Sequence, residues 1–153
     1  MKNTLPLFIV GIAAILGVAL WPRNVWATPE RGLIYETDFK QAEKENNLPA
    51  GLLSRMAYQE SQYDPHAQGG SGEIGIMQII PKWHPGINPA NPIASIHYVG
   101  QLMRQYYNRF GSWEKALAAY NWGPTALTRY GIDRAPTSTK RYIHDVLTDI
   151  GLR

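Results

Sequence analysis

Apolar residues recur at helical spacing over most of the chain, and one stretch shows the pattern most clearly. Its positions follow the spacing i, i+1, i+4, i+5, i+8, which places them on one face of an α-helix: Leu52, Leu53, Met56, Ala57 and Glu60. We expect this helix to have Pro49 in its first turn, where proline is tolerated, and to stop at Asp64-Pro65. The last position on this apolar face is therefore a glutamate.

Five further helices are predicted. One is capped by Thr37 or Asp38 and runs to about Asn46, and a long one starts near Pro92. Another opens at Ser112 with Glu114 and ends at Gly123-Pro124, where a short helix begins, and the last covers about Ser138 to Leu152. The expected inward residues are Ile93, Ile96, Gly100, Met103, Tyr107 and Phe110 in the long helix, and Tyr142, Ile143, Val146, Leu147 and Ile150 in the last.

The middle of the chain lacks the helical pattern and is rich in glycine and proline. Residues 66–75 form a glycine-rich loop with room for a small hairpin, and residues 81–92 contain four prolines, which indicates irregular structure. No internal repeat is visible. The pattern predicts a mainly α single domain with a small irregular or hairpin lobe.

Residues 1–27 resemble a targeting segment. The run from Leu5 to Leu20 is almost wholly apolar, Lys2 precedes it, and Val25-Trp26-Ala27 ends it like a cleavage site. As a helix this run would span about 24 Å, short of a roughly 30 Å hydrocarbon core, although Trp21 and Trp26 could anchor an uncleaved segment at an interface. We expect a signal peptide or N-terminal membrane anchor over 1–27, a separate domain over 28–153, and export to the periplasm or the membrane surface. A buried core helix is the remaining alternative.

Composition narrows the function classes. The chain has 153 residues, which suits one domain, and no cysteine, so disulfides and thiolate metal sites are excluded. The four histidines lack the spacing of a zinc site. Of the 15 basic residues, Lys2 and Arg23 precede residue 28, so the domain has 13 basic and 12 acidic residues. With no concentrated basic patch, nucleic-acid binding is not expected, and membrane contact is expected only through the N-terminal segment.

Glu60 is the candidate for chemistry. It lies on an apolar face near the C-terminal end of its helix, and both burial and the helix dipole favour its protonated form. A carboxyl group that stays protonated near neutral pH can act as a general acid. On spacing alone, an ordinary glutamate at an exposed helix end is the simpler interpretation.

Three motifs change that balance. They are Glu60-Ser61, then Gly75-Ile76-Met77-Gln78-Ile79, then Ala119-Tyr120-Asn121-Trp122-Gly123-Pro124, with Asp64-Pro65, Pro81 and Phe110-Gly111 between them. In this order and spacing the chain resembles the lytic transglycosylase family, which shares the goose-type lysozyme fold. The resemblance covers roughly residues 35–135.

The resemblance implies a lysozyme-like fold and a role for each motif. Glu60 would be the single acid and base, and Tyr120 would face it from another helix. The substrate-binding residues would be Ser61, Gly75, Met77, Gln78, Tyr120 and Asn121. The expected reaction cleaves the β-1,4 bond between N-acetylmuramic acid and N-acetylglucosamine in peptidoglycan glycan strands and leaves a 1,6-anhydro end, without metal or cofactor. Further partners in an envelope-spanning assembly or a virion fit such a short exported enzyme.

Several alternatives stay open. Glu73 could serve as the base of a true hydrolase, or be a solvated loop residue; a third possibility is a glycan-binding assembly protein without turnover. Ser61 either steadies Glu60 or ends its helix, Gln78 either binds ligand or is a core amide, and Asn121 could be a helix cap. The packing of its helix alone could explain Tyr120, and Trp83 and Trp122 either stack on sugars or belong to the core. One departure from the family pattern is Gly69, where many members have serine.

Overall fold

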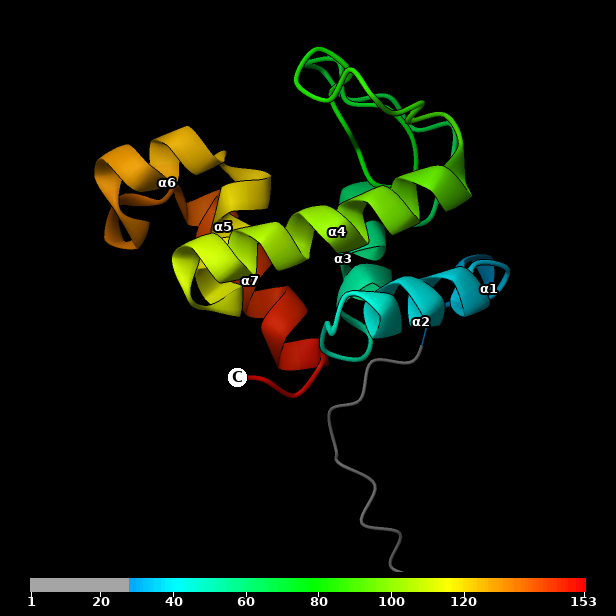
Figure 1. Cartoon of the computed structure of the whole chain (residues 1–153), viewed down its shortest axis with the longest axis horizontal. Coiled ribbons are helices and arrows are strands. Elements are labelled where there is room, and N and C mark those ends of the chain that lie inside the picture. The colour runs from blue at the N-terminus through cyan, green and yellow to red at the C-terminus, as the bar shows by residue number, and fades with distance from the viewer. Residues whose placement is uncertain (1–27) are drawn as a thin grey trace, which may run out of the picture.

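The computed structural model describes residues 28–153, which form a mainly helical domain (Figure 1). No strand forms in this part of the chain. The elements are α1 (Glu30–Leu33), α2 (Glu36–Glu45), α3 (Leu52–Ser61), α4 (Pro92–Phe110), α5 (Trp113–Asn121), α6 (Pro124–Tyr130), a 3₁₀ turn η1 (Ile132–Arg134) and α7 (Thr137–Asp149).

The predicted signal peptide or anchor, residues 1–27, lies outside the described residues. Within residues 28–153, no helix has both the length and the apolar character needed to cross a membrane.

Helix α3 is at the centre of the domain. Its first six residues, from Leu52 to Ala57, are all buried, and the helix packs against α2, α4 and α7. A helix that is buried on every side must be surrounded by other elements. The amphipathic helices around it, with α5 packed between α4 and α7, complete the core.

The start of α3 differs from the prediction. Pro49 lies before the helix, which begins at Leu52 after Gly51 adopts a left-handed conformation with φ +83°. The buried carboxylate of Glu43 in α2 accepts hydrogen bonds from the N–H groups of Gly51 and Leu53, at 2.9 and 2.8 Å. A side chain from another helix therefore satisfies the free donors at this terminus, and no local proline signal is needed.

Two other predicted boundaries were wrong. Helix α2 begins at Glu36, with Tyr35 before it and no side-chain cap, so Thr37 and Asp38 lie inside its first turn. Helix α3 ends because Gln62 adopts a left-handed conformation with φ +53°, two residues before Asp64-Pro65.

The long helix α4 begins at Pro92, as predicted, and ends at Phe110. The Asn91 side chain accepts from the N–H of Ala94, Pro92 occupies the first turn, and Gly111 terminates the helix with φ +81°. Gly100 lies against α2, and a Cβ there would approach the Cβ of Ala42 to 3.4 Å. The inward assignment of Ile93 was wrong: this side chain is 49% exposed, because burial along α4 begins only at Ser95.

Helix α7 ends at Asp149, three residues before the predicted Leu152, and four of its five predicted inward residues are buried. The irregular lobe, residues 62–91, stands at the end of the molecule where α4 begins (Figure 1). Instead of a regular hairpin it contains two isolated bridges, Gln68 with Ile74 and Ile74 with Ile79.

Candidate active site

Glu60 lies in the last turn of α3, where this buried helix reaches the wall of a cleft of about 710 Å³. Burial raises the pKa of its carboxyl group to about 7, from an ordinary value of 4.5. The nearby charge of Glu73 raises it further, whereas the hydroxyl of Tyr142 favours the charged form and lowers it. Glu60 can therefore hold or release a proton near neutral pH, as an acid–base catalyst must.

Two tyrosines approach Glu60 from other helices. Tyr120 comes from α5 and lines the cleft, and Tyr142 comes from α7 and is 7% exposed. Within residues 28–153, the Tyr142 hydroxyl has no partner apart from its interaction with Glu60. Burial and the charge of Glu60 raise the pKa of both tyrosines well above 10, so both hydroxyls stay neutral.

The packing of α7 on α3 places Tyr142. Arg55, one turn and a half before Glu60, is 6% exposed and forms an ion pair with Asp149 near the end of α7. The two helices are also in direct contact. Tyr142 lies on the same buried stripe of α7 as Val146, so the ion pair and this stripe together hold the hydroxyl against Glu60.

The turn Gly75–Gln78 forms the wall beside Glu60. The backbone groups of Ile74 and Ile79 exchange two hydrogen bonds, of 3.0 and 3.1 Å, which close the turn. Gly75 has φ +77°, and a Cβ there would lie 2.2 Å from the carbonyl oxygen of Pro89. Only glycine can occupy this position, because a side chain would meet both an unfavourable φ and fixed backbone.

Two side chains fix this turn to the helices, and a third joins it to the preceding loop. The Ser61 hydroxyl donates to the carbonyl of Ile76 at 2.8 Å, and the Tyr120 hydroxyl donates to the carbonyl of Met77. Gln78, with φ +49°, donates its amide to the carbonyls of Gly75 and Ala67, at 2.9 and 3.3 Å. The turn is thereby held between the end of α3 and the side of α5.

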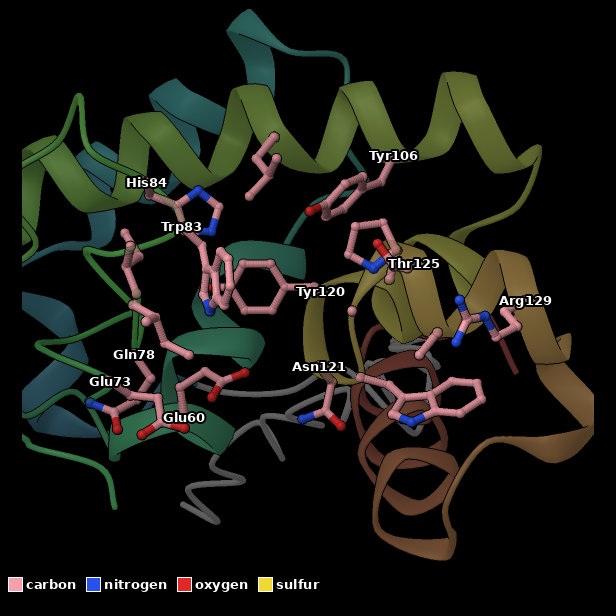
Figure 2. A pocket seen from close by; sticks show the side chains of 18 of the residues that line it. Glu60, Glu73, Gln78, Trp83, His84, Tyr106, Tyr120, Asn121, Thr125 and Arg129 are labelled. Atoms are coloured by element: carbon pink, nitrogen blue, oxygen red, sulfur yellow. The ribbon is translucent and has the colours of Figure 1, made fainter. Parts of the chain in front are cut away.

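Figure 2 shows Trp83 and His84 on the same side of the cleft as Glu60, and Arg129 on the opposite side. At one end Trp83 is 67% exposed, with the Lys82 ammonium 4.8 Å from its ring centre, and His84 is bonded to the Tyr98 hydroxyl at 2.7 Å. At the other end lie Arg129 and Tyr130 of α6 together with Trp122, which directly follows α5. A cleft of this shape and lining suits an extended, polar ligand with flat faces, such as a chain of sugars.

The structure places the predicted site residues in two groups. Glu60, Gln78, Tyr120 and Asn121 line the cleft. Ser61, Gly75 and Met77 are not among its lining residues: Gly75 and the Met77 side chain are buried, and Ser61 is bonded to backbone. These three residues therefore lie behind Gln78, away from the surface of the cleft.

Asn121 is the last residue of α5 and not the cap, which is Trp122. Its side-chain oxygen accepts a hydrogen bond from Thr139 of α7, at 2.8 Å. Of the two tryptophans, Trp83 stands in the cleft and Trp122 both lines the cleft and packs on the core.

Sequence reasoning missed the role of Tyr142, which it assigned only to the inward stripe of the last helix. Nothing local marks this tyrosine, since its proximity to Glu60 arises from the packing of α7 on α3. Arg129 was also missed. It lines the cleft, but nothing in the neighbouring sequence indicates this. Between residues 28 and 153, no group of three or more acidic, histidine or cysteine side chains is arranged to hold a metal ion.

Comparison with known proteins agrees with this geometry. Membrane-bound lytic murein transglycosylase F 2 of Alkalilimnicola ehrlichii is 47% identical over 45 residues, 29% of this chain and 10% of that protein. The transglycosylase of Enterobacteria phage PRD1 is 29% identical over 114 residues, 72% of this chain and 41% of that protein. Membrane-bound lytic murein transglycosylase F of Alcanivorax borkumensis is 35% identical over 101 residues, 59% of this chain and 21% of that protein.

The chain thus spans less than half the length of each of these relatives. The family model described as the transglycosylase SLT domain matches residues 38–143, which is more than half of the chain and includes Glu60, the Gly75–Gln78 turn and Tyr142. The chain therefore belongs to the transglycosylase SLT domain family.

Proposed function

We propose that this chain is a lytic transglycosylase that cleaves peptidoglycan glycan strands between N-acetylmuramic acid and N-acetylglucosamine. The observation that carries the proposal is Glu60, a largely buried carboxyl group with a pKa of about 7 on the wall of a cleft of about 710 Å³. A single group that acts first as acid and then as base needs a pKa near the working pH. Membership in the SLT family supports the same reaction class.

The proposed reaction begins with protonated Glu60 on the side of the scissile bond. Its proton passes to the glycosidic oxygen as the bond from that oxygen to C1 of the muramoyl residue breaks. Glu60, now a carboxylate, then takes the proton from the muramoyl 6-hydroxyl, whose oxygen bonds to C1. Atoms balance without water, and the product ends in a 1,6-anhydro ring.

This reaction explains how one acid–base residue can suffice. A hydrolase needs a second carboxylate to activate water or to act as nucleophile, whereas here the attacking hydroxyl belongs to the substrate. Gln78, Tyr120 and Asn121 are the proposed substrate-binding residues on the cleft wall, with Trp83 as a stacking surface for a sugar ring. Ser61, Gly75 and Met77 would act indirectly, by holding the Gly75–Gln78 turn in place.

Hydrolysis is the second candidate function, and Glu73 is the observation that favours it. Its carboxylate lines the same cleft as Glu60 and is close enough to raise the pKa of that residue. Digestion of purified sacculi in ¹⁸O-labelled water separates the two reactions. Transglycosylation predicts anhydro-ended products without label, and hydrolysis predicts reducing ends that carry one ¹⁸O atom.

We extend the proposal to the cellular setting. Peptidoglycan lies outside the inner membrane, so action on the wall of the producing cell would require export, and residues 1–27 would provide the signal peptide or anchor. The names of the relatives, two membrane-bound enzymes and one phage transglycosylase, support action at the cell envelope, alone or within an envelope assembly or virion. Intact-mass measurement of protein from the membrane and periplasmic fractions distinguishes a retained anchor from cleavage after Ala27.

A further inference from the structure

The side chain of Glu73 folds over Gly69. A Cβ built at Gly69 would lie 2.3 Å from Oε2 of Glu73 and 2.9 Å from its Cβ. The second contact involves an atom attached directly to the backbone, so rotation of the Glu73 side chain could not relieve it. Every residue other than glycine at position 69 would therefore displace Glu73.

The main chain of the same loop fixes Glu73 in this position. The Gly69 N–H donates to the Glu73 carbonyl at 2.9 Å, and the Ser71 N–H donates to the Glu73 carboxylate at 2.8 Å. These two hydrogen bonds hold the Glu73 side chain in one place instead of leaving it free in solvent.

This charge faces Glu60 across the cleft corner that both residues line (Figure 2). The other groups that act on the Glu60 carboxyl are the hydroxyls of Tyr120 from α5 and Tyr142 from α7. Both tyrosines are neutral, since burial raises their pKa values well above 10. Among these three neighbours, Glu73 is the carboxylic acid, and its charge disfavours ionisation of Glu60.

We propose that Gly69 and Glu73 act as a pair, in which the carboxylate seated over the bare backbone of Gly69 adds to burial in favouring the protonated form of Glu60. The proposal rests on the acid–base role given to Glu60 above, and it makes Glu73 a positioning residue that does not itself react. It also accounts for the glycine at position 69, because a side chain there would occupy the space that the Glu73 carboxylate fills.

Electrostatics gives the direction of the effect. When Glu60 loses its proton, two negative charges share one cleft, which disfavours the ionised form of Glu60. Removing the charge of Glu73 must lower the pKa of Glu60 and reduce its protonated fraction above neutral pH. Below about pH 5 Glu60 is protonated with or without Glu73, so the effect must vanish there.

The test compares the full chain with Glu73→Gln, which keeps an oxygen for the Ser71 N–H and removes only the charge. The titration of Glu60 is followed by NMR of its carboxyl carbon, and glycan release from sacculi is measured against pH. We expect the titration to move to lower pH and release near pH 8 to fall about threefold or more, with rates near pH 5 within about twofold of the parent. Glu30→Gln, a charge removal outside the cleft, should leave both curves unchanged.

Gly69→Ser is the second variant, because it displaces Glu73 without changing its charge. Its curves should move in the same direction as those of Glu73→Gln, with folding checked by circular dichroism. Superimposable titrations of Glu60 in the parent and Glu73→Gln would overturn the proposal. Loss of release by Glu73→Gln at every pH, together with ¹⁸O-labelled products from the parent, would also overturn the proposal. Glu73 would then be the base of a hydrolase. An inactive parent would count against the proposed function alone, since the NMR titration needs no turnover.

Discussion

The Tyr120 hydroxyl in α5 donates a hydrogen bond to the backbone carbonyl of Met77, 43 residues away in the chain. This contact fixes the Gly75–Gln78 turn against the helix that forms the opposite wall of the cleft. Tyr120 therefore has two roles. It lies beside Glu60, and it holds the Gly75–Gln78 turn in place.

Tyr120→Phe should loosen this wall. It removes the donor while leaving the Met77 residue buried, and an unsatisfied buried carbonyl costs roughly 1–3 kcal/mol. We expect a fall of this size in the free energy of unfolding, measured by urea denaturation, together with weaker glycan release. Tyr130→Phe, at a side chain that is 51% exposed, is the control and should change stability by less than about 0.5 kcal/mol. Equal stability of the two variants would contradict a structural role for the Tyr120 hydroxyl.

Gly75→Ala tests the close approach of the turn to Pro89. The new Cβ would lie 2.2 Å from a backbone carbonyl oxygen and would require φ +77°. Gly72→Ala is a matched control, because Gly72 has φ +92° but no atom within 4 Å of the new Cβ. We expect Gly72→Ala to lower stability by about 1 kcal/mol from backbone strain alone, and Gly75→Ala to lower it by several times as much. Similar melting temperatures for both would show that the approach to Pro89 is not rigid.

Tyr142→Phe should move the pH dependence of glycan release upward. The Tyr142 hydroxyl favours the charged form of Glu60 and so lowers its pKa. Without this hydroxyl Glu60 holds its proton to higher pH, which is the opposite direction to the change expected for Glu73→Gln. The pH profile of kcat/KM reports this group in the free enzyme. A downward shift, or none, would show that Tyr142 acts on Glu60 only through packing.

Glu60 should also make stability depend on pH. Its pKa is about 7 in the folded chain and 4.5 as an ordinary glutamate, so the folded state binds the proton more tightly. The resulting stabilisation is present below about pH 4.5 and is lost as pH rises through about 7, by up to roughly 3 kcal/mol. Glu60→Gln should lack this decline and be more stable than the parent at pH 8. Parallel stability curves from urea denaturation would contradict the raised pKa.

The success of sequence reasoning depended on whether a signal was local. The start of α4 was predicted well because it is determined by adjacent residues, with the Asn91 side chain as cap and Pro92 in the first turn. The start of α3 was missed because its capping group, Glu43, belongs to another helix. Ile93 follows the periodicity of α4 but lies in its first turn, where no neighbouring helix covers it.

The same distinction holds for the site. Glu60 and Gln78 could be found from motifs in the sequence, and both line the cleft. The hydroxyl of Tyr142 could not, because its relation to Glu60 joins α7 to α3 across 82 positions of the chain. Glu73 and Gly69 were each noticed separately in the sequence. Only the folded loop shows that the Glu73 side chain fills the space beside Gly69.

The most direct test of the account is release of muropeptides from purified sacculi by the parent and by Glu60→Gln, followed by mass spectrometry. We predict anhydro-ended products from the parent and a rate about a hundred- to ten-thousandfold lower from the variant, with binding to sacculi retained. Release by Glu60→Gln at the parental rate would contradict the assignment of Glu60 as acid and base. Binding without release by the parent itself would instead identify a glycan-binding protein.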